Sequence, residues 1–140
     1  MEFLYESGLL FKDRIVFPIT GADLSGAYLP GRLLEKANLI DARLQRAYLV
    51  GARLREADLL FAKLMEANLE GANLSGARLF RAMLRGANLH GADLTGATGI
   101  TNEELEQQAY SLKGATMPNG QKYEDWLKDQ EGRNEDGANK

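Results

Sequence analysis

Histidine and cysteine, two residue types that often carry acid–base and nucleophilic chemistry, are almost missing from this sequence. Histidine occurs once, as His90, and cysteine does not occur. A histidine-based triad, a multi-histidine metal site and thiolate chemistry therefore lack parts within the chain. His90 could act as a proton shuttle or a metal ligand only beside an oriented partner in a pocket, and a solvated surface position is the simpler interpretation. We expect no catalytic residue, no metal site and no bound cofactor, and hence no enzyme.

The composition is typical of one globular domain. The chain has 140 residues, with 17 basic against 20 acidic residues and a formal net charge of −3. A chain of this length suits a single domain of ordinary size. No apolar run approaches the roughly 20 residues of a membrane-spanning helix. We therefore expect no direct membrane insertion and a cytoplasmic location, with any tether supplied by a longer parent chain.

A five-residue repeat runs through the middle of the chain. Alanine stands two residues before a leucine in nearly every repeat, and Arg32 is the one exception between positions 22 and 97. Asp or Asn often lies between the alanine and the leucine, and glycine often follows the leucine after one further residue. The leucines recur without interruption at Leu24, Leu29, Leu34, Leu39, Leu44, Leu49, Leu54, Leu59, Leu64, Leu69, Leu74, Leu79, Leu84, Leu89 and Leu94.

A period of five fits neither a straight helix nor a continuous strand. Five helical residues turn by about 500°, which spreads the leucines over every face. On a strand, leucines at this spacing would lie alternately on opposite faces. A short extended side followed by a corner satisfies the pattern, because alanine and leucine then point the same way and glycine accommodates the bend. The repeated leucines are then the structural core of a solenoid.

The outward residues indicate how many sides make one coil. At a spacing of twenty residues, Tyr28 aligns with Tyr48, and five of the six charged pairs have opposite signs. At a spacing of fifteen, five pairs are opposite and two are alike, and Ile40 would lie over Arg55. Since neighbouring outward residues should be compatible, we expect four sides and twenty residues per coil.

The tandem Ala-(Asp/Asn)-Leu pattern resembles the pentapeptide-repeat proteins over about residues 17–98, with Phe17 and Ile19 as the first inward pair. The resemblance implies an all-β solenoid, namely a right-handed quadrilateral β-helix, here of about four coils. It assigns leucine and alanine to the interior and the other three residues of each repeat to solvent. Arg32 departs from this pattern, because an inward arginine is a buried charge. We expect a bulge at residues 30–31, or an Arg32 close enough to the N-terminal end to reach solvent.

Both flanks of the repeat domain, which we place at 17–100, are expected to cover its ends. Residues 1–16 are apolar enough to form an N-terminal cap. On the other side, residues 101–130 are expected to form a helical C-terminal cap, and the polar segment 131–140 is expected to be disordered.

The C-terminal cap is predicted to begin with a capping box at Thr101 and Glu104. It favours a helix over about 102–112, with Leu105, Ala109 and Leu112 on one stripe, that ends at Gly114. A turn at residues 118–120 and a short second helix around residues 123–127 follow.

One outward series is apolar. Ile40, Leu60, Phe80 and Ile100 stack at a spacing of twenty, and Phe61 lies alongside them. An exposed apolar patch is a liability unless something covers it. The helix that follows Ile100, a second copy of the chain and a separate protein partner all remain open as the cover. These five residues form the candidate interface.

Charge separates the possible functions. Some quinolone-resistance members of the family that this sequence resembles bind DNA gyrase by imitating the duplex, which needs dense negative charge. Residues 21–98 instead hold ten basic and eight acidic residues, and the acidic excess lies in residues 99–140. We therefore expect a non-catalytic rigid scaffold or protein–protein interaction module. Its partner would be an unidentified protein or a second copy in a homodimer, with no nucleic acid.

Two alternative functions stay open. One is a DNA-mimic modulator of gyrase or topoisomerase. The other is the soluble domain of a larger membrane-associated bacterial protein, since the segments that flank the repeats are similar to those that bracket the repeat domain in such proteins.

Overall fold

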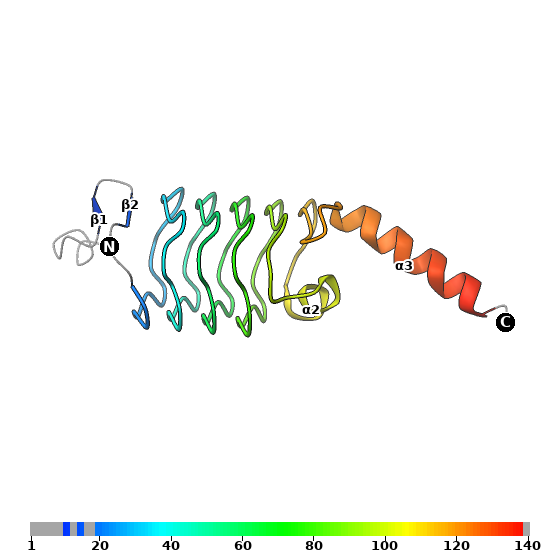
Figure 1. The fold of residues 1–140 in the computed structure, drawn as a ribbon, viewed down its shortest axis with the longest axis horizontal. Helices are drawn as coiled ribbons and strands as arrows, with labels where there is room; N and C mark the ends of the chain where they lie inside the picture. Colours follow the sequence, from blue (N-terminus) through cyan, green and yellow to red (C-terminus); the bar gives the residue numbers. More distant parts are fainter. Residues whose placement is uncertain (1–9, 12–13, 16–18, 139–140) are drawn as a thin grey trace.

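The computed structural model describes residues 10–11, 14–15 and 19–138. Two short strands, β1 (Leu10–Phe11) and β2 (Arg14–Ile15), pair in the antiparallel sense. The repeats then wind through successive coils of one elongated rod, and helices α2 (Asn102–Gln108) and α3 (Tyr123–Ala138) follow at its C-terminal end (Figure 1). Among the described residues, no helix is long and apolar enough to cross a membrane.

A parallel backbone ladder joins each coil to the next. Its bridges pair residues twenty positions apart, such as Asp23 with Arg43 and Arg43 with Lys63. Leu44 donates its N–H to the carbonyl of Lys63 at 2.7 Å, and Lys63 donates to the carbonyl of Ala42 at 2.9 Å. Twenty residues contain four pentapeptides, so one coil of the rod uses four repeats.

The repeated leucines and alanines fill the interior of the rod. The fifteen leucines that recur every five residues from Leu24 to Leu94 are all buried, and none of them is more than 5% exposed. The alanines are buried from Ala42 onward, whereas those of the first coil are only partly buried. Each leucine buried in this way contributes roughly 1.5–3 kcal/mol relative to an exposed one. The stack of leucines is therefore the main apolar core of the protein.

The chain turns between sides through a residue in the left-handed backbone conformation. Glycine occupies many of these corners, for example Gly31 with a φ of 63°. A side chain in this conformation costs about 1–2 kcal/mol, so glycine is the unstrained choice. Seven non-glycine residues among those that the structure describes nevertheless adopt it, with φ between 56° and 58°: Lys36, Asp41, Arg46, Glu56, Phe61, Glu66 and Arg81.

The ladder is unbroken around Arg32, so the expected bulge at residues 30–31 is wrong. Gly31 donates to the carbonyl of Val50 at 2.8 Å, and Arg53 donates to the carbonyl of Arg32 at 2.8 Å. Arg32 keeps the inward position and is half-buried. It lies in the first coil, where the neighbouring alanines are also partly exposed, and this partial exposure agrees with the alternative expectation that it reaches solvent.

At the N-terminal end of the rod, Ile19 belongs to the buried core. Its N–H donates to the carbonyl of Asn38 at 3.0 Å, so the ladder already includes it. Phe17, the expected partner of Ile19, and most of the expected cap at residues 1–16 lie outside the described residues.

Helix α2 begins as the sequence predicts and ends earlier. The Thr101 side chain accepts a hydrogen bond from the N–H of Glu104, and the Glu104 carboxylate accepts one from the N–H of Thr101, which completes the capping box. The helix stops at Gln108, and Ala109 is extended, with φ −68° and ψ 145°. The predicted end near residue 112 is therefore wrong.

After α2 the chain returns to the solenoid. Ser111 bridges to Asn88, and Thr116 bridges to Asp93, both in the parallel sense. The spacing is 23 rather than twenty, because the coil that contains α2 has three additional residues. Three residues of this return, Leu112, Ala115 and Met117, join the buried core. Gly114, with φ 70°, turns a corner of the solenoid and does not end a helix.

Helix α3 is longer than the sequence suggests. It begins at Tyr123 and extends to Ala138, so most of the segment expected to be disordered, 131–140, is helical. Its first turn packs on the rod, where Trp126 is buried and stacks on Tyr123 with 6.1 Å between ring centroids. Extending a helix from an anchored first turn is easier than nucleating one, and good helix formers such as Lys128, Gln130 and Arg133 alternate here with the poor helix formers Gly132 and Gly137.

Replacing Leu64 by lysine tests the inward position of the leucines. Leu64 is fully buried in the middle of the rod, so the new ammonium group would have no partner. We expect the cooperative thermal transition seen by circular dichroism to be lost, since the penalty of several kcal/mol approaches the roughly 5–15 kcal/mol that stabilises a domain. Met65→Lys, at the neighbouring outward position, is the matched control and should melt near the wild type. A cooperative melt of Leu64→Lys at the wild-type temperature would contradict the assignment.

A second test concerns the contact between α3 and the rod. The Glu124 carboxylate accepts a hydrogen bond from the N–H of Gly114 at 2.7 Å, and this bond holds the pKa of Glu124 below its ordinary value. The pKa of Glu124 is lower in the folded protein than in the unfolded chain. The hydrogen bond therefore stabilises the docked helix at pH values above the unfolded-state pKa, and this stabilisation is lost as the pH falls through the folded-state pKa. We expect the Gly114 amide resonance to titrate below the ordinary pKa of glutamate and not to titrate in Glu124→Gln. If the Gly114 resonance of the wild type titrated at the ordinary pKa of glutamate, the assigned hydrogen bond between Glu124 and Gly114 would be wrong.

Candidate interaction surface

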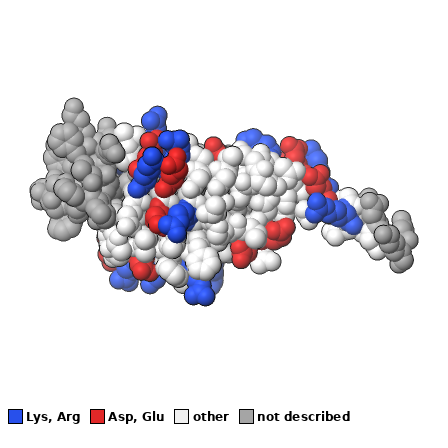
Figure 2. All heavy atoms as spheres, in the orientation of Figure 1, with Lys and Arg blue, Asp and Glu red and all other residues white. Residues whose placement is uncertain are grey.

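Ion pairs between successive coils cover much of the exterior. Four of them join residues twenty positions apart: Arg78 with Asp58 at 2.6 Å, Arg46 with Glu66 at 2.9 Å, Lys36 with Glu56 at 3.6 Å, and Arg43 with Asp23 at 3.7 Å. Figure 2 shows basic and acidic side chains interleaved along the displayed face of the rod. Exposed pairs of this kind contribute at most about 1 kcal/mol each, so they describe a solvated exterior more than a source of stability.

Uncharged outward residues also stack from coil to coil. The rings of Tyr28 and Tyr48 lie 5.0 Å apart at 18°, and Asn88 donates its side-chain amide to Asn68 Oδ1 at 3.2 Å. His90 is exposed at the next corner, where its backbone N–H donates to Asn88 Oδ1 at 3.1 Å. In the part of the chain that the structure describes, no three His, Asp or Glu side chains gather closely enough to hold a metal ion.

Hydroxyl side chains stabilise the corners. Ser75 Oγ donates to Asn73 Oδ1 at 2.6 Å within one corner. Hydrogen bonding by Ser25 holds the pKa of Asp23 below its ordinary value, and Arg43 adds to the effect. Asp23 is exposed, so this shift describes a local turn and not a buried catalytic carboxylate.

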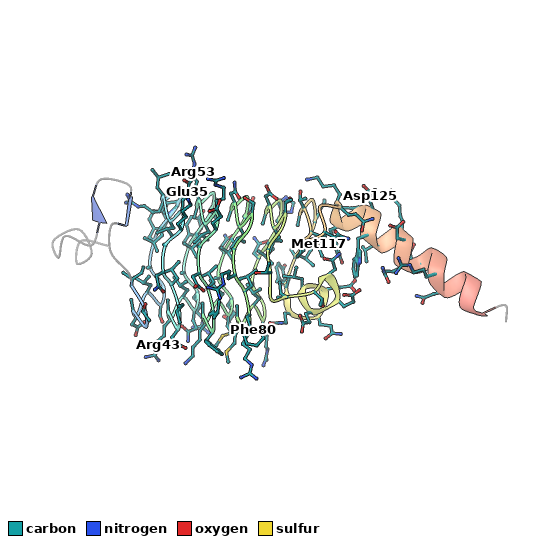
Figure 3. The ribbon with its side chains drawn as sticks, viewed as in Figure 1. Glu35, Arg43, Arg53, Phe80, Met117 and Asp125 are labelled. Atoms are coloured by element: carbon teal, nitrogen blue, oxygen red, sulfur yellow. The ribbon has the colours of Figure 1, made fainter. Side chains whose placement is uncertain are left out.

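The five residues of the candidate interface lie at one corner of successive coils, which we call the apolar corner: Ile40, Leu60, Phe61, Phe80 and Ile100. Ile40, Leu60 and Ile100 are half-buried, whereas Phe80 is 50% exposed and Phe61 is 37% exposed. The rings of Phe61 and Phe80 meet edge to face, with 6.2 Å between centroids. Phe80 projects from the edge of the rod at the bottom of Figure 3.

Helix α2 leaves the aromatic part of the apolar corner exposed. Leu105 and Leu112, which were expected to line one helical stripe, are both buried in the core of the rod. Their side chains therefore extend the interior rather than the exterior. The helix does not cover Phe80, which keeps half of its surface accessible to solvent.

Gly99 allows the backbone to pass close to Phe80. Its φ is 80°, and a Cβ at this position would lie 2.5 Å from the backbone nitrogen of Phe80 and 2.8 Å from its Cβ. The sequence analysis did not single out Gly99. A signal was nevertheless present, because Gly99 stands five residues after Leu94, where the repeat would place the next leucine. Gly99 thus positions the exposed aromatic ring.

Hollows lie on the outside of the rod. One of about 290 Å³ lies between α2, the turn after Met117 and α3, and Asn102 and Trp126 are among its lining residues. Another of about 480 Å³ lies at a corner and is lined by Arg46, Met65 and Glu66 among others. Both are open to solvent, so neither offers the enclosed, desolvated setting that a catalytic site needs.

Replacing Gly99 by alanine tests this close approach. The methyl group would force the backbone away from Phe80 and would also place a side chain at φ 80°. We expect the free energy of unfolding, measured in urea, to fall by about 1–3 kcal/mol. Gly132→Ala is the matched control. It lies in α3 with open space around it and should be neutral or raise helicity. Equal stability of Gly99→Ala and the wild type would refute the contact.

Comparison with known proteins places these features in one family. The sequence pattern of pentapeptide repeats matches residues 19–55, 33–71 and 62–98, with eight copies. None of the curated proteins matches this chain.

Similar solved structures are themselves pentapeptide repeat proteins. One is from the thylakoid lumen of Arabidopsis thaliana, with 30% identity, 75% of this chain and 62% of that chain covered, and a TM-score of 0.43. Another is HetL from the cyanobacterium Nostoc sp. strain PCC 7120, involved in heterocyst differentiation regulation, with 33% identity, 80% and 56% coverage, and a TM-score of 0.40. A third is Rfr23 from the cyanobacterium Cyanothece 51142, with 29% identity, 82% and 94% coverage, and a TM-score of 0.42.

This chain spans about three-fifths of the length of the first two structures. The repeat pattern itself covers residues 19–98, which is more than half of the chain. The protein therefore belongs to the pentapeptide-repeat family, whose members form right-handed β-helices.

Proposed function

We propose that this protein is a non-catalytic, rigid scaffold that recognises another protein through its apolar corner. Its framework would be a quadrilateral rod of about four coils, in which each of the four pentapeptides of a coil forms one side and α2 caps the C-terminal end. Such a rod presents outward residues at fixed positions, because each side chain lies on a backbone held by its neighbours above and below.

The observation that carries this proposal is the exposed aromatic pair. Phe61 and Phe80 contact each other on an exterior whose other contacts include ion pairs, an amide ladder and the stacked phenol rings of Tyr28 and Tyr48. Exposed apolar patches on soluble proteins commonly mark interaction surfaces. Aromatic residues are also enriched among the residues that contribute most to protein–protein binding.

Mimicry of DNA is not favoured by the charges. Residues 21–98 carry ten basic and eight acidic groups, whereas a duplex mimic presents a continuous negative surface. In the described part of the rod, acidic side chains such as Asp58 and Glu66 are paired with arginines. We therefore propose protein recognition as the function. Inhibition of gyrase in a DNA supercoiling assay would support the alternative.

Site-specific photo-crosslinking tests the proposed function. A photoreactive phenylalanine at position 80 should form protein adducts, or crosslinked dimers, in an extract of the source organism. The matched control is the same group at position 28, an exposed aromatic position on another side of the rod. Sedimentation velocity of the wild type beside Phe80→Glu then separates the two cases, since a dimer that this change dissociates identifies a second copy as the partner. The absence of adducts at position 80, or equal adducts at both positions, would remove the proposal.

A further inference from the structure

We propose that the apolar corner is part of a larger surface that binds an acidic segment of a protein partner, anchored by an apolar side chain of that segment. This inference rests on the proposed function and names the chemistry of the partner. The surface, which we call the basic aromatic surface, consists of Phe61, Lys63, Phe80, Arg81, Met83 and Arg85.

The members of the basic aromatic surface are contiguous. The Arg81 guanidinium carbon lies 5.5 Å from the centroid of the Phe80 ring, which itself contacts Phe61. Lys63 and Met83 are bridge partners on successive coils, so their outward side chains lie side by side. Arg85 follows Met83 at the next corner of the same side. Figure 3 shows Phe80 on the same edge of the rod as Arg43, which precedes Lys63 in this row of bridges.

The basic aromatic surface carries three cations, Lys63, Arg81 and Arg85. Four other cations of the rod, Lys36, Arg43, Arg46 and Arg78, are each paired with a carboxylate of the neighbouring coil. In the described part of the chain, Lys63, Arg81 and Arg85 take part in no ion pair. Glu66, which lies at the corner below Gly86, is engaged by Arg46 at 2.9 Å. A partner segment that brings carboxylates would therefore meet three available cations, and complementary charge favours both encounter and orientation.

The apolar members require an anchor as well as charge. Phe80 and Met83 are each about half exposed, at 50% and 48%. Phe61 is the one apolar side chain among the seven non-glycine residues in the left-handed conformation. A purely ionic partner would leave these three side chains uncovered, so we infer an apolar residue between the partner's carboxylates.

The dimensions fit a short extended segment. Arg81 and Arg85 flank Met83 and are four residues apart along one side. At about 3.3 Å per residue, they are separated by at most about 13 Å. About four residues of an extended partner cover this distance, with a carboxylate near each arginine and the apolar residue over Met83 and Phe80.

Fluorescence anisotropy with a defined peptide tests the inference on the full chain. The probe is a fluorescein-labelled Asp-Glu-Glu-Phe-Leu-Glu-Glu-Asp peptide, beside one peptide with lysine at every acidic position and one with alanine in place of Phe and Leu. We expect only the first peptide to bind well at low salt, and expect its affinity to fall roughly tenfold or more in about 0.5 M salt.

Two double variants with the same change in net charge localise the binding. Arg81→Glu combined with Arg85→Glu should weaken binding by roughly tenfold or more. Arg53→Glu combined with Lys113→Glu reverses two exposed cations on other sides of the rod and should stay within about twofold of the wild type. Thermal melts should show that both variants fold, since all four positions are exposed.

Each of the following results would overturn the inference. Equal weakening in both double variants would show unspecific attraction, and equal binding of the alanine peptide would show that no apolar anchor is needed. Absence of peptide binding while crosslinks still form at position 80 would reject the acidic partner and leave the proposed function standing. If neither peptide binding nor crosslinks at position 80 were observed, the proposed function itself would be rejected. Binding to phosphatidylserine vesicles in place of the peptide would assign the surface to a membrane and would also overturn the inference.

Discussion

Hydrogen bonding between the backbones of successive coils is the constraint on which the rest of this structure depends. Each coil must return to the same place after twenty residues so that residues such as Leu44 and Lys63 can bond in register. Any one position of the repeat then meets the same position of the next coil at a distance of about 4.8 Å. Leucine therefore lies above leucine in the interior, and alanine, the smaller of the two inward residues, fills the space that remains beside it.

The same register organises the exterior, where it sets which outward side chains become neighbours. Tyr28 stacks on Tyr48 and Arg78 pairs with Asp58 because each pair is twenty residues apart. Since the backbone of the rod is held on both sides, the outward side chains keep fixed positions, which suits recognition of a partner. Because leucine and alanine side chains fill the interior, we expect the function to lie on the exterior. The contact between Phe61 and Phe80 is the place where the pattern of paired charges gives way to exposed aromatic surface.

Periodicity also explains where prediction from the sequence failed. The capping box at Thr101 was recognisable because its residue types and spacing are local. The return to the solenoid was not, because Tyr110 and Met117 stand where the pattern has alanine and leucine, and because α2 shifts the spacing to 23. Leu112 was consequently placed on a helical stripe although it lies in the core of the rod. The extent of α3 was missed since its outer residues carry no apolar pattern and follow from the anchored first turn.

The amino-acid sequence by itself determined the repeat, the inward leucines and the twenty-residue coil, because these features depend on a period that is written in consecutive residues. It also determined that the chain has one histidine and no cysteine. Only the tertiary structure decided that Gly99 passes beside Phe80, that Arg81 lies against its ring, and that Lys63 and Arg85 make no ion pair with any residue that the structure describes. These relations depend on distances between side chains of different coils and on which of several carboxylates each cation reaches, and no periodic pattern in the chain specifies them.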